Sequence, residues 1–498
     1  MNIDAILQET TIYRRRLKLS SVTDGLGMGD AYGATLDRIN GQGGERARLG
    51  MTALMWISHA ERPLKPDELC HALAVEIGSP NLNSDNIPSI RTLLGCCQGL
   101  VFIDKEASIV RLIHSTLQEY LRAHPQLFGA AHSTIAETCL SYLNSQQVMA
   151  LSAIPSPDPQ NTLFPGYSPP HWRCSRTYSS TPFLEYSSLY WGIHAKRELS
   201  DCAKLLARKL FDDHNSHISA IVLLKAQMPY VHPNDFHRIS LFRSLHSASI
   251  FGIDEIVVSL VEVEGCDINQ KDCLGNTPLV YAARNGHEGV VKILLGQNNA
   301  SPDMAGKFGY TPLWCAAGNG HEGVVKVLLE RDDVNPEKPT ESGTTPLAWA
   351  VERGHEGVVK ILLGREDVNP EKPDNRGKTP LWYAARYGQE GVVKILLRRD
   401  DVNPNKPNKI GRTPLSQAIQ EGHAGVVALL QPLASTNPSA APVQEVTIPI
   451  TPADYRYNNP YTTSTRSALI SQARPPRPLP PTPHSRTASS RVLKRRHR

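Results

Sequence analysis

Apolar residues recur with a fixed spacing of 34 residues through the second half of the chain. The sequence GHEGVVKILL occurs at 286–295 and again, unchanged, at 354–363, and near copies occupy 320–329, 388–397 and 422–430. Its two valines and two leucines fall three and four positions apart, so they share one face of an α-helix. Each copy therefore predicts a short amphipathic helix whose apolar face must be covered by a neighbour.

The tripeptide TPL precedes each copy with the same 34-residue spacing. Threonine is a favoured N-cap and proline is favoured at the first helical position, so TPL predicts the start of another helix. One glycine stands two residues before each threonine and a second opens each copy, which predicts positive-φ turns on both sides of that helix. The residues are Thr277, Thr311, Thr345, Thr379 and Thr413, then Gly275, Gly309, Gly343, Gly377 and Gly411, and finally Gly286, Gly320, Gly354, Gly388 and Gly422.

Each unit ends in a segment such as 365–377, which is rich in Pro, Asn and Asp and predicts a turn-forming connection. A degenerate sixth copy of the unit lies at 243–261. Two short helices and a loop cannot bury their own apolar face, whereas three or more stacked copies can. We therefore predict a mainly α fold built as a repeat solenoid.

The combined pattern G-x-TPL…AA..GHxxVVxLL resembles the ankyrin repeat over roughly 240–431. The period of 34 departs from the usual value of about 33, and the extra residue falls in the Pro-rich loop. The position after TPL, often His in the family, holds Val280, Trp314, Ala348, Trp382 or Ser416. The resemblance implies a non-catalytic array that binds other proteins through its loop tips and the exposed side of its first helices.

The candidate partner-binding residues are those that vary between copies. They follow the turn glycine, stand near the cap glycine, or are aromatic residues of the kind enriched at binding hot spots. For the tryptophans, packing between repeats is an equally weighted alternative. The set is Asn276, Arg284, Tyr310, Trp314, Asn319, Thr344, Arg353, Lys378, Trp382, Tyr383, Tyr387, Arg412 and Glu421.

The histidines of the repeated phrase form a ladder of His287, His321, His355 and His423, with Gln389 at the fourth place. Stacked helices lie about 8–10 Å apart, whereas two ligands of one zinc ion lie at most about 4 Å apart. Glutamine would also interrupt a proton relay, but it retains a hydrogen bond at a helix start. We therefore predict a structural role for the ladder and no metal site.

The segment 46–125 shows a different pattern. Helices are predicted at 46–60, 66–76 and 86–99, two short strands at 100–103 and 108–113, and a further helix from Ser115 with an S-x-x-Q capping box. Three helices followed by a β-hairpin are typical of a winged helix. The recognition-helix candidate carries one cation, Arg91, which is a poor electrostatic footprint, so direct DNA binding is not expected.

The wording of this segment, ALMWISHAERPLKPDELCHALAVE and LLGCCQGLVFIDKEASIVRLIHSTLQEYL, resembles the GPI inositol-deacylase-type winged helix. That segment follows the NACHT nucleotide-binding domain in fungal NOD-like receptor proteins, where ankyrin arrays commonly come next, and its name implies no deacylase activity. The NTPase itself requires a G-x-x-x-x-G-K-[ST] loop, which this sequence lacks. The resemblance therefore implies a chain without the NACHT core, and we expect no nucleotide or other cofactor.

The sequence divides into five parts. We predict a remnant N-terminal segment at 1–45, a winged-helix domain at 46–125, and a helical linker at 126–239 that contains an amphipathic helix at 183–211 and a disordered insertion at 150–182. Ankyrin repeats at 240–431 and a disordered, Pro-rich basic tail at 432–498 complete the chain.

The tail holds two short motifs. Arg477, Pro480 and Pro483 have the spacing of an SH3 ligand. Arg491, Lys494, Arg495, Arg496 and Arg498 form a basic cluster that is a candidate nuclear localisation signal. From residue 431 onward the chain has 10 Lys/Arg and 2 Asp/Glu, a charge of +8, so the remainder of this +5 protein is mildly acidic.

The nine cysteines include no C-x-x-C pair, which favours a reducing compartment over a zinc site or a disulfide framework. We see no signal peptide and no apolar run long enough for a membrane span. The expected location is the cytoplasm or the nucleus.

We find no H-E-x-x-H, G-x-S-x-G or paired-carboxylate motif, so no enzymatic activity is expected. The sequence favours a protein–protein interaction scaffold with a regulatory or signalling role. Two alternatives stay open at this point: a nuclear ankyrin-repeat co-regulator of transcription, and a truncated relic of a NOD-like receptor.

Overall fold

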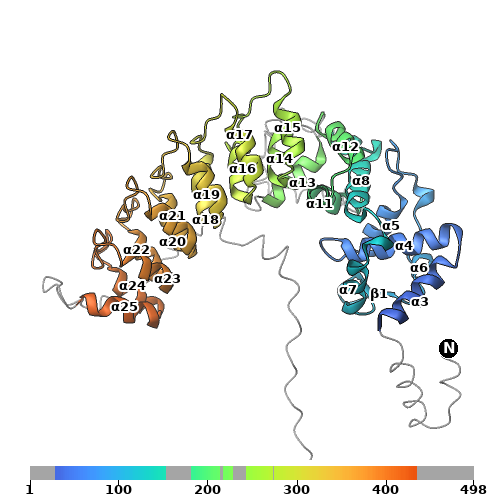
Figure 1. Cartoon of the computed structure of the whole chain (residues 1–498), viewed down its shortest axis with the longest axis horizontal. Helices are drawn as coiled ribbons and strands as arrows, with labels where there is room; N and C mark the ends of the chain where they lie inside the picture. Colours follow the sequence, from blue (N-terminus) through green and yellow to red (C-terminus); the bar gives the residue numbers. More distant parts are fainter. Residues whose placement is uncertain (1–27, 153–180, 213–216, 228–242, 273, 435–498) are drawn as a thin grey trace, which may run out of the picture.

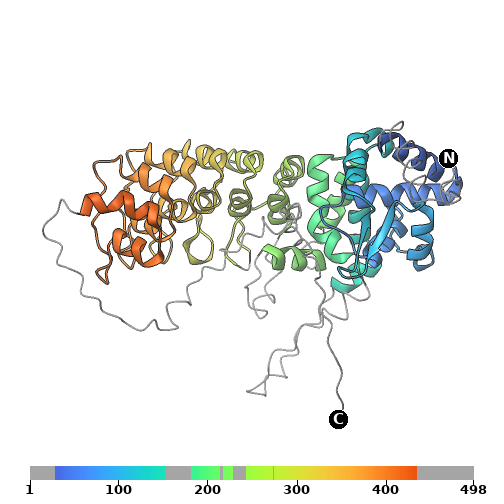
Figure 2. The ribbon, with the colours of Figure 1, turned by 90° about the horizontal axis from the view of Figure 1, so that it is seen from below.

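The computed structural model describes residues 28–152, 181–212, 217–227, 243–272 and 274–434. These parts form an elongated arch, with the N-terminal helices at one end and the last repeats at the other (Figure 1, Figure 2). The N-terminal segment before residue 28, most of the predicted insertion, the SH3-type motif and the basic cluster of the tail lie outside the described residues.

The first unit has the predicted order of three helices, a hairpin and a further helix. Strands β1 and β2 pair antiparallel, with Val101 opposite Leu112. Its elements are α4 (Gly44–His59), α5 (Pro66–Ala74), the short 3₁₀ turn η1 (Ser84–Asn86), α6 (Ile90–Cys96), β1 (Val101–Asp104), β2 (Ile109–Leu112) and α7 (Ser115–Ala123). The winged-helix prediction is therefore confirmed at the level of its elements.

One local detail of this unit differs from the sequence expectation. Helix α7 is capped by His114, whose Nδ1 accepts from the amide of Thr116, so the predicted S-x-x-Q capping box starting at Ser115 is wrong. Within the predicted N-terminal segment 1–45, residues 28–40 form helix α3 (Met28–Asn40). Leu36 and Ile39 bury α3 against the winged-helix core.

The linker is helical, but its 183–211 segment is two helices instead of one. Glu198 adopts an extended conformation that ends the first helix, and the hydroxyl of Ser200 accepts from the amide of Ala203 at the start of the second. The linker elements are η2 (Pro125–Leu127), α8 (Ala131–Leu143), α9 (Gln146–Met149), η3 (Ala150–Ser152), α11 (Leu184–Arg197), α12 (Asp201–Asp212) and α13 (Ile218–Gln227).

The array consists of six helix pairs, and each pair is one copy of the repeat. The first helices form one layer, α14, α16, α18, α20, α22 and α24, and the second helices form another. We call these the first-helix layer and the second-helix layer. The pairs are α14 (Ser244–Phe251) with α15 (Asp254–Val261), α16 (Pro278–Asn285) with α17 (Glu288–Leu295), α18 (Pro312–Gly318) with α19 (Glu322–Leu329), α20 (Pro346–Arg353) with α21 (Glu356–Leu363), α22 (Pro380–Arg386) with α23 (Glu390–Leu396), and α24 (Pro414–Glu421) with α25 (Ala424–Ala434). A short 3₁₀ turn, η6 (Lys307–Gly309), precedes α18.

The predicted caps are confirmed in all five TPL copies. Each threonine hydroxyl accepts from the amide three residues later, as Thr311 does from Trp314 at 3.1 Å, and proline occupies the first turn. The glycines on both sides of the first helix have positive φ, for example Gly377 at 78° and Gly388 at 68°. A side chain would be strained there, which explains why glycine recurs.

One continuous apolar core runs from Leu36 in α3 to Leu430 in α25. The linker joins the array where α11 packs on α14, with the rings of Trp191 and Phe251 4.8 Å apart. Gly192 permits this approach, because a Cβ there would lie 2.2 Å from Cγ of Phe251. No helix in the described part of the chain combines the length and apolarity needed to cross a bilayer.

Candidate protein-binding surface

The ladder residues join each repeat to the one before it. The Nε2–H of His321 donates to the carbonyl oxygen of Arg284 at 2.9 Å, near the C-terminal end of the preceding first helix. Equivalent bonds are made by His287 to Ile250, His355 to Gly318, Gln389 to Glu352 and His423 to Arg386. The role is structural, as predicted, but the acceptor belongs to the preceding repeat and not to the helix start that the sequence suggested.

A metal role for the ladder has no geometric support. Each imidazole Nε2 is occupied by a carbonyl of the neighbouring repeat. In the described residues, no group of three His, Cys, Asp or Glu side chains is arranged to hold a metal ion.

The loops carry a second set of cross-repeat contacts. Arg365 donates to the carbonyl oxygen of Leu329 at 3.2 Å, at the end of the preceding second helix, while it pairs with Asp367. Arg331 and Arg399 make the same contacts in their own repeats. Lys372 donates to the carbonyl of Glu337 and pairs with its carboxylate at 3.2 Å. The constant residues of the loops are therefore engaged in holding the stack.

The first-helix layer is apolar on two faces. Leu279, Ala282 and Ala283 of α16 belong to the main core with the second helices. A second, separate cluster consists of Val280, Trp314, Cys315 and Trp349, with Tyr310 packed against it. Positions 280 and 279 are 100° apart on the helix, so this cluster lies to the side of the main core. A layer that packs on two sides presents aromatic residues away from its own partner helices.

Aromatic rings stack along this second face. Tyr310 lies 4.2 Å from Trp314, and Trp314 lies 4.7 Å from Trp349, in both cases nearly parallel. Trp349 is one residue later in its repeat than Trp314, which lets the two indoles overlap. The sequence reading missed Trp349; its tryptophan in an otherwise Ala-rich helix was the available signal.

The candidate residues divide by burial. The side chains of Tyr387, Asn319, Arg412 and Glu421 are exposed, and those of Arg284, Tyr310, Arg353 and Lys378 are partly exposed. The remaining five candidates, Asn276, Trp314, Thr344, Trp382 and Tyr383, are buried. Trp314 and Trp382 pack against neighbouring side chains, as the alternative reading of the tryptophans predicted. The five buried side chains are therefore not part of the binding surface.

Cations lie over the aromatic rings of α20 and α22. Lys378 Nζ is 4.4 Å and Arg386 Cζ is 5.6 Å from the centroid of the Trp382 ring. Arg353 Cζ is 4.6 Å from the ring of Trp349. Arg386 also lies 5.7 Å from the ring of Tyr387, which is 44% exposed. These contacts are cation–π pairs, which fix long side chains in place while leaving their charged ends accessible.

The titratable groups beside these cations are perturbed. Burial lowers the pKa of Lys378, and the neighbouring Arg386 lowers it further. Burial also raises the pKa of Glu352, whose carboxylate accepts a hydrogen bond from Tyr387. The pKa of Tyr387 is raised to about 12, mainly by burial and then by the charge of Glu352. Perturbed groups that gather on a surface are typical of functional sites.

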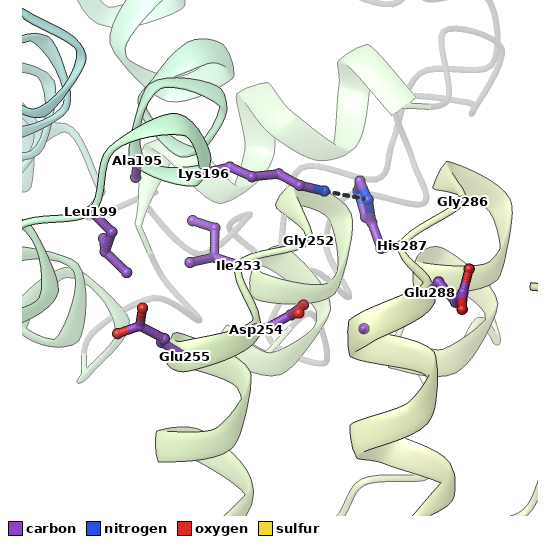
Figure 3. Close-up of a pocket in the computed structure, with 11 residues that line it drawn as sticks. Ala195, Lys196, Leu199, Gly252, Ile253, Asp254, Glu255, Gly286, His287 and Glu288 are labelled. Atoms are coloured by element: carbon purple, nitrogen blue, oxygen red, sulfur yellow. Dashed lines mark hydrogen bonds between the residues drawn. The ribbon is translucent and has the colours of Figure 1, made fainter. Parts of the chain in front are cut away.

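A small cavity of about 400 Å³ lies where the linker meets the first two repeats (Figure 3). Lys196 reaches across Gly252 to His287, with Nζ 3.0 Å from Nδ1. An ammonium only donates, so Nδ1 accepts and the ring proton is on Nε2, which donates to the Ile250 carbonyl. A Cβ at Gly252 would lie 2.3 Å from the His287 ring. We interpret this cavity as part of the joint between linker and array.

Comparison with known families agrees with this arrangement. Four overlapping segments, 245–339, 293–374, 330–408 and 365–440, match the model for ankyrin repeats (3 copies). Residues 39–131 match the model for the winged helix domain of GPI inositol-deacylase, so this match includes the end of α3. A search among curated proteins finds no match. The chain therefore combines a winged-helix domain of the GPI inositol-deacylase type with a following array of ankyrin repeats.

Proposed function

We propose that the protein is a non-catalytic scaffold with a regulatory or signalling role, which holds partner proteins on the first-helix layer of its array. The observation that carries this proposal is the group of cations Arg353, Lys378 and Arg386, which lie over the aromatic rings of α20 and α22 beside the exposed ring of Tyr387. Aromatic and arginine side chains are enriched at protein-binding hot spots. The constant residues of the repeats are engaged in stacking, which leaves the variable ones for recognition.

In this proposal the winged-helix unit packs against the rest of the chain and does not bind DNA. Arg111, one of the two cations of its hairpin, pairs with Asp104 at 3.2 Å. The amide of Val110 donates to the carbonyl of Leu64, which ties the hairpin to its own helices. Its core continues through α8 and α11 into the array.

Proximity labelling with the full chain tests the proposal. We expect a set of labelled proteins that is retained by residues 1–434 and lost from residues 1–242, because the latter lacks every repeat. A chain with the surface substitutions Lys326→Gln and Lys394→Gln, on the exposed side of the second helices, serves as the control and should label the same set. A set that is unchanged in 1–242 would contradict the scaffold role of the array.

A further inference from the structure

One part of the first-helix layer gathers three cations on aromatic rings. We call it the cation–aromatic patch: Arg353, Lys378 and Arg386 with the rings of Trp349, Trp382 and Tyr387. It lies on α20, α22 and the turn that leads into α22. In the loops between repeats, by contrast, Lys372 pairs with Glu337 and Lys406 with Glu371, both at 3.2 Å.

Lys378 and Arg386 instead lie on aromatic rings. In the described residues, neither has a carboxylate oxygen within 4.0 Å of its charged nitrogens. The acidic groups whose charges act on Lys378 are Asp374 and Glu352. Asp374 accepts from the hydroxyl of Tyr383 at 2.8 Å and from backbone amides of its own loop, so its oxygens are already engaged.

The patch is also partly buried and positively charged. Burial and the charge of Arg386 both lower the pKa of Lys378. The surroundings therefore disfavour the charged form of its ammonium group. The positive charges of Arg353, Arg376, Lys378 and Arg386 around this patch outnumber the negative charges of Glu352 and Asp374. A partly buried cation without an acidic partner costs free energy that an incoming carboxylate relieves. Lys409 and Arg412 extend the positive charge on the exposed surface of the next repeat.

We propose that the cation–aromatic patch binds an acidic, extended segment of a partner protein. Carboxylates of the segment meet Lys378 and Arg386, and an apolar side chain beside them lies against the exposed ring of Tyr387. This inference rests on the proposed scaffold function and names the chemistry of its partner. Charge complementarity of this kind sets partner choice and association rate.

A nucleic acid fits the patch less well. Bases bind by stacking on open aromatic faces. The face of Trp382 is covered by Lys378 and Arg386, that of Trp349 by Arg353 and Trp314, and both indoles are 4% exposed or less. The side chains that remain accessible are charged ends, which suit carboxylates.

Fluorescence anisotropy with the full-length protein tests the proposal. The probe is a labelled synthetic peptide of repeated Glu-Glu-Leu units, compared with Gln-Gln-Leu repeats of equal length and with a single-stranded oligothymidine of equal charge. We expect the acidic peptide to bind roughly tenfold more tightly than the neutral one at low salt. Lys378→Gln with Arg386→Gln should remove most of that difference, and Lys378→Arg with Arg386→Lys should restore it.

The control pair is Lys326→Gln with Lys394→Gln, which removes the same charge from exposed positions in α19 and α23. Circular dichroism and thermal melting establish that each variant is folded. Equal binding of acidic and neutral peptides, tighter binding of the oligonucleotide, or equal losses in the patch and control variants would each overturn the proposal.

Proximity labelling of the patch variant distinguishes a failure of the acidic-segment proposal from a failure of the proposed scaffold function. If Lys378→Gln with Arg386→Gln keeps the full set of labelled partners, the array is a scaffold but the patch is not its acidic site. If the unmodified chain labels nothing that depends on its repeats, the proposed function itself fails.

Discussion

Each ladder residue stabilises the boundary between two repeats with one hydrogen bond. Gln389 shows which part of histidine matters, because its amide reaches the Glu352 carbonyl at 3.5 Å where the histidines reach theirs at 2.8–3.1 Å. Each ladder position therefore supplies an N–H donor to the preceding repeat, and histidine places that donor closer to the carbonyl oxygen than glutamine does. The ring also packs on the cap glycine of the preceding repeat, where a Cβ at Gly286 would lie 2.5 Å from His321.

We predict that His321→Ala lowers the free energy of unfolding by about 1–3 kcal/mol, since the carbonyl of Arg284 loses this donor. His321→Gln should lose less than His321→Ala, because glutamine makes the same bond at position 389. Urea unfolding followed by tryptophan fluorescence measures both. The control is His71→Ala, whose ring bonds within its own helix to Asp67. Equal losses for alanine and glutamine would show that the ring's packing, not the hydrogen bond, matters.

The sequence predicted much at this scale, but not the acceptors. The threonine caps and positive-φ glycines follow from local chemistry, so Thr379 and Gly388 were predicted correctly. The acceptor of His321 lies 37 residues earlier, and only the stacking geometry brings the two together. The burial of Trp314 and Trp382 could not be decided either, because it depends on Trp349, Lys378 and Arg386 from other turns and repeats.

At the scale of elements, close packing between helices decides how the linker joins the array. Gly192 in α11 faces Phe251 in α14, and the contact leaves no space for a methyl group. Alanine would raise helix propensity by about 1 kcal/mol, but overpacking a core typically costs about 1–3 kcal/mol. The steric term is the larger of the two.

We therefore predict that Gly192→Ala destabilises the protein, as a lower urea midpoint. The matched control is Gly95→Ala in α6, where no atom lies within 4 Å of the added Cβ, so this variant should gain stability. Combining Gly192→Ala with Phe251→Ala should cost less than the sum of the two, because the methyl then occupies vacated space. Strict additivity would mean that the two residues are not in contact.

Helices α8 and α11 meet at a cluster of histidines. His132 Nδ1 lies 2.8 Å from His194 Nδ1, and the hydroxyl of Tyr186 bonds His194 Nε2. Burial lowers the pKa of His132 to about 4, with a further contribution from Arg197. Burial lowers the pKa of His194 to about 3, and His132 adds to this. The neutral imidazoles are therefore favoured by the fold.

Because both folded-state pKa values lie below the ordinary value of 6.5, unfolding takes up protons as the pH falls. We predict that these groups contribute fully to stability above about pH 6.5 and that the contribution is lost progressively between about pH 6.5 and pH 3. Thermal melting across this range measures the slope. His132→Gln with His194→Gln should flatten it, whereas His71→Gln should not. An unchanged slope in the double variant would assign the acid sensitivity to other groups.

Helices with a clear hydrophobic periodicity or with marked capping residues were predicted well. The break between two linker helices and helix α3 were not predicted. The repeat helices follow from TPL and the valine–leucine face, whereas the break at Glu198 has no Gly or Pro to mark it. Helix α3 was not among the predicted helices, and Leu36 and Ile39 supply the tertiary contacts that favour it. At α3, tertiary packing outweighs the low helix propensity of Gly29 and Gly33.

At the scale of the molecule, one core passes from the winged helix through the linker to the last repeat. The linker helices α11 and α12 stand beside α14 and α15 as a further helix pair would, and Lys204 pairs with Glu255 across that boundary at 2.6 Å. The linker therefore covers the first repeat, which would otherwise expose an apolar face, as a terminal capping repeat does in a solenoid. The sequence reading treated it only as a connection.

Charge is also divided along the chain, since the tail carries +8 and the rest of the protein −3. We propose that the cluster Arg491, Lys494, Arg495, Arg496 and Arg498 directs nuclear import, which its sequence supports.

Deletion of 491–498 should lower the nuclear fraction of a fluorescent fusion severalfold, because the clustered cations of an import signal are read together. The control replaces Arg456, Arg466, Arg474, Arg477 and Arg486 by alanine, which removes as many cations from dispersed positions of the tail and should change the distribution less. A chain that keeps its nuclear fraction without the cluster, or that never enters the nucleus, would leave the tail with a different role. If import is lost while repeat-dependent labelling persists in the cytoplasm, the scaffold works independently of where the tail sends it.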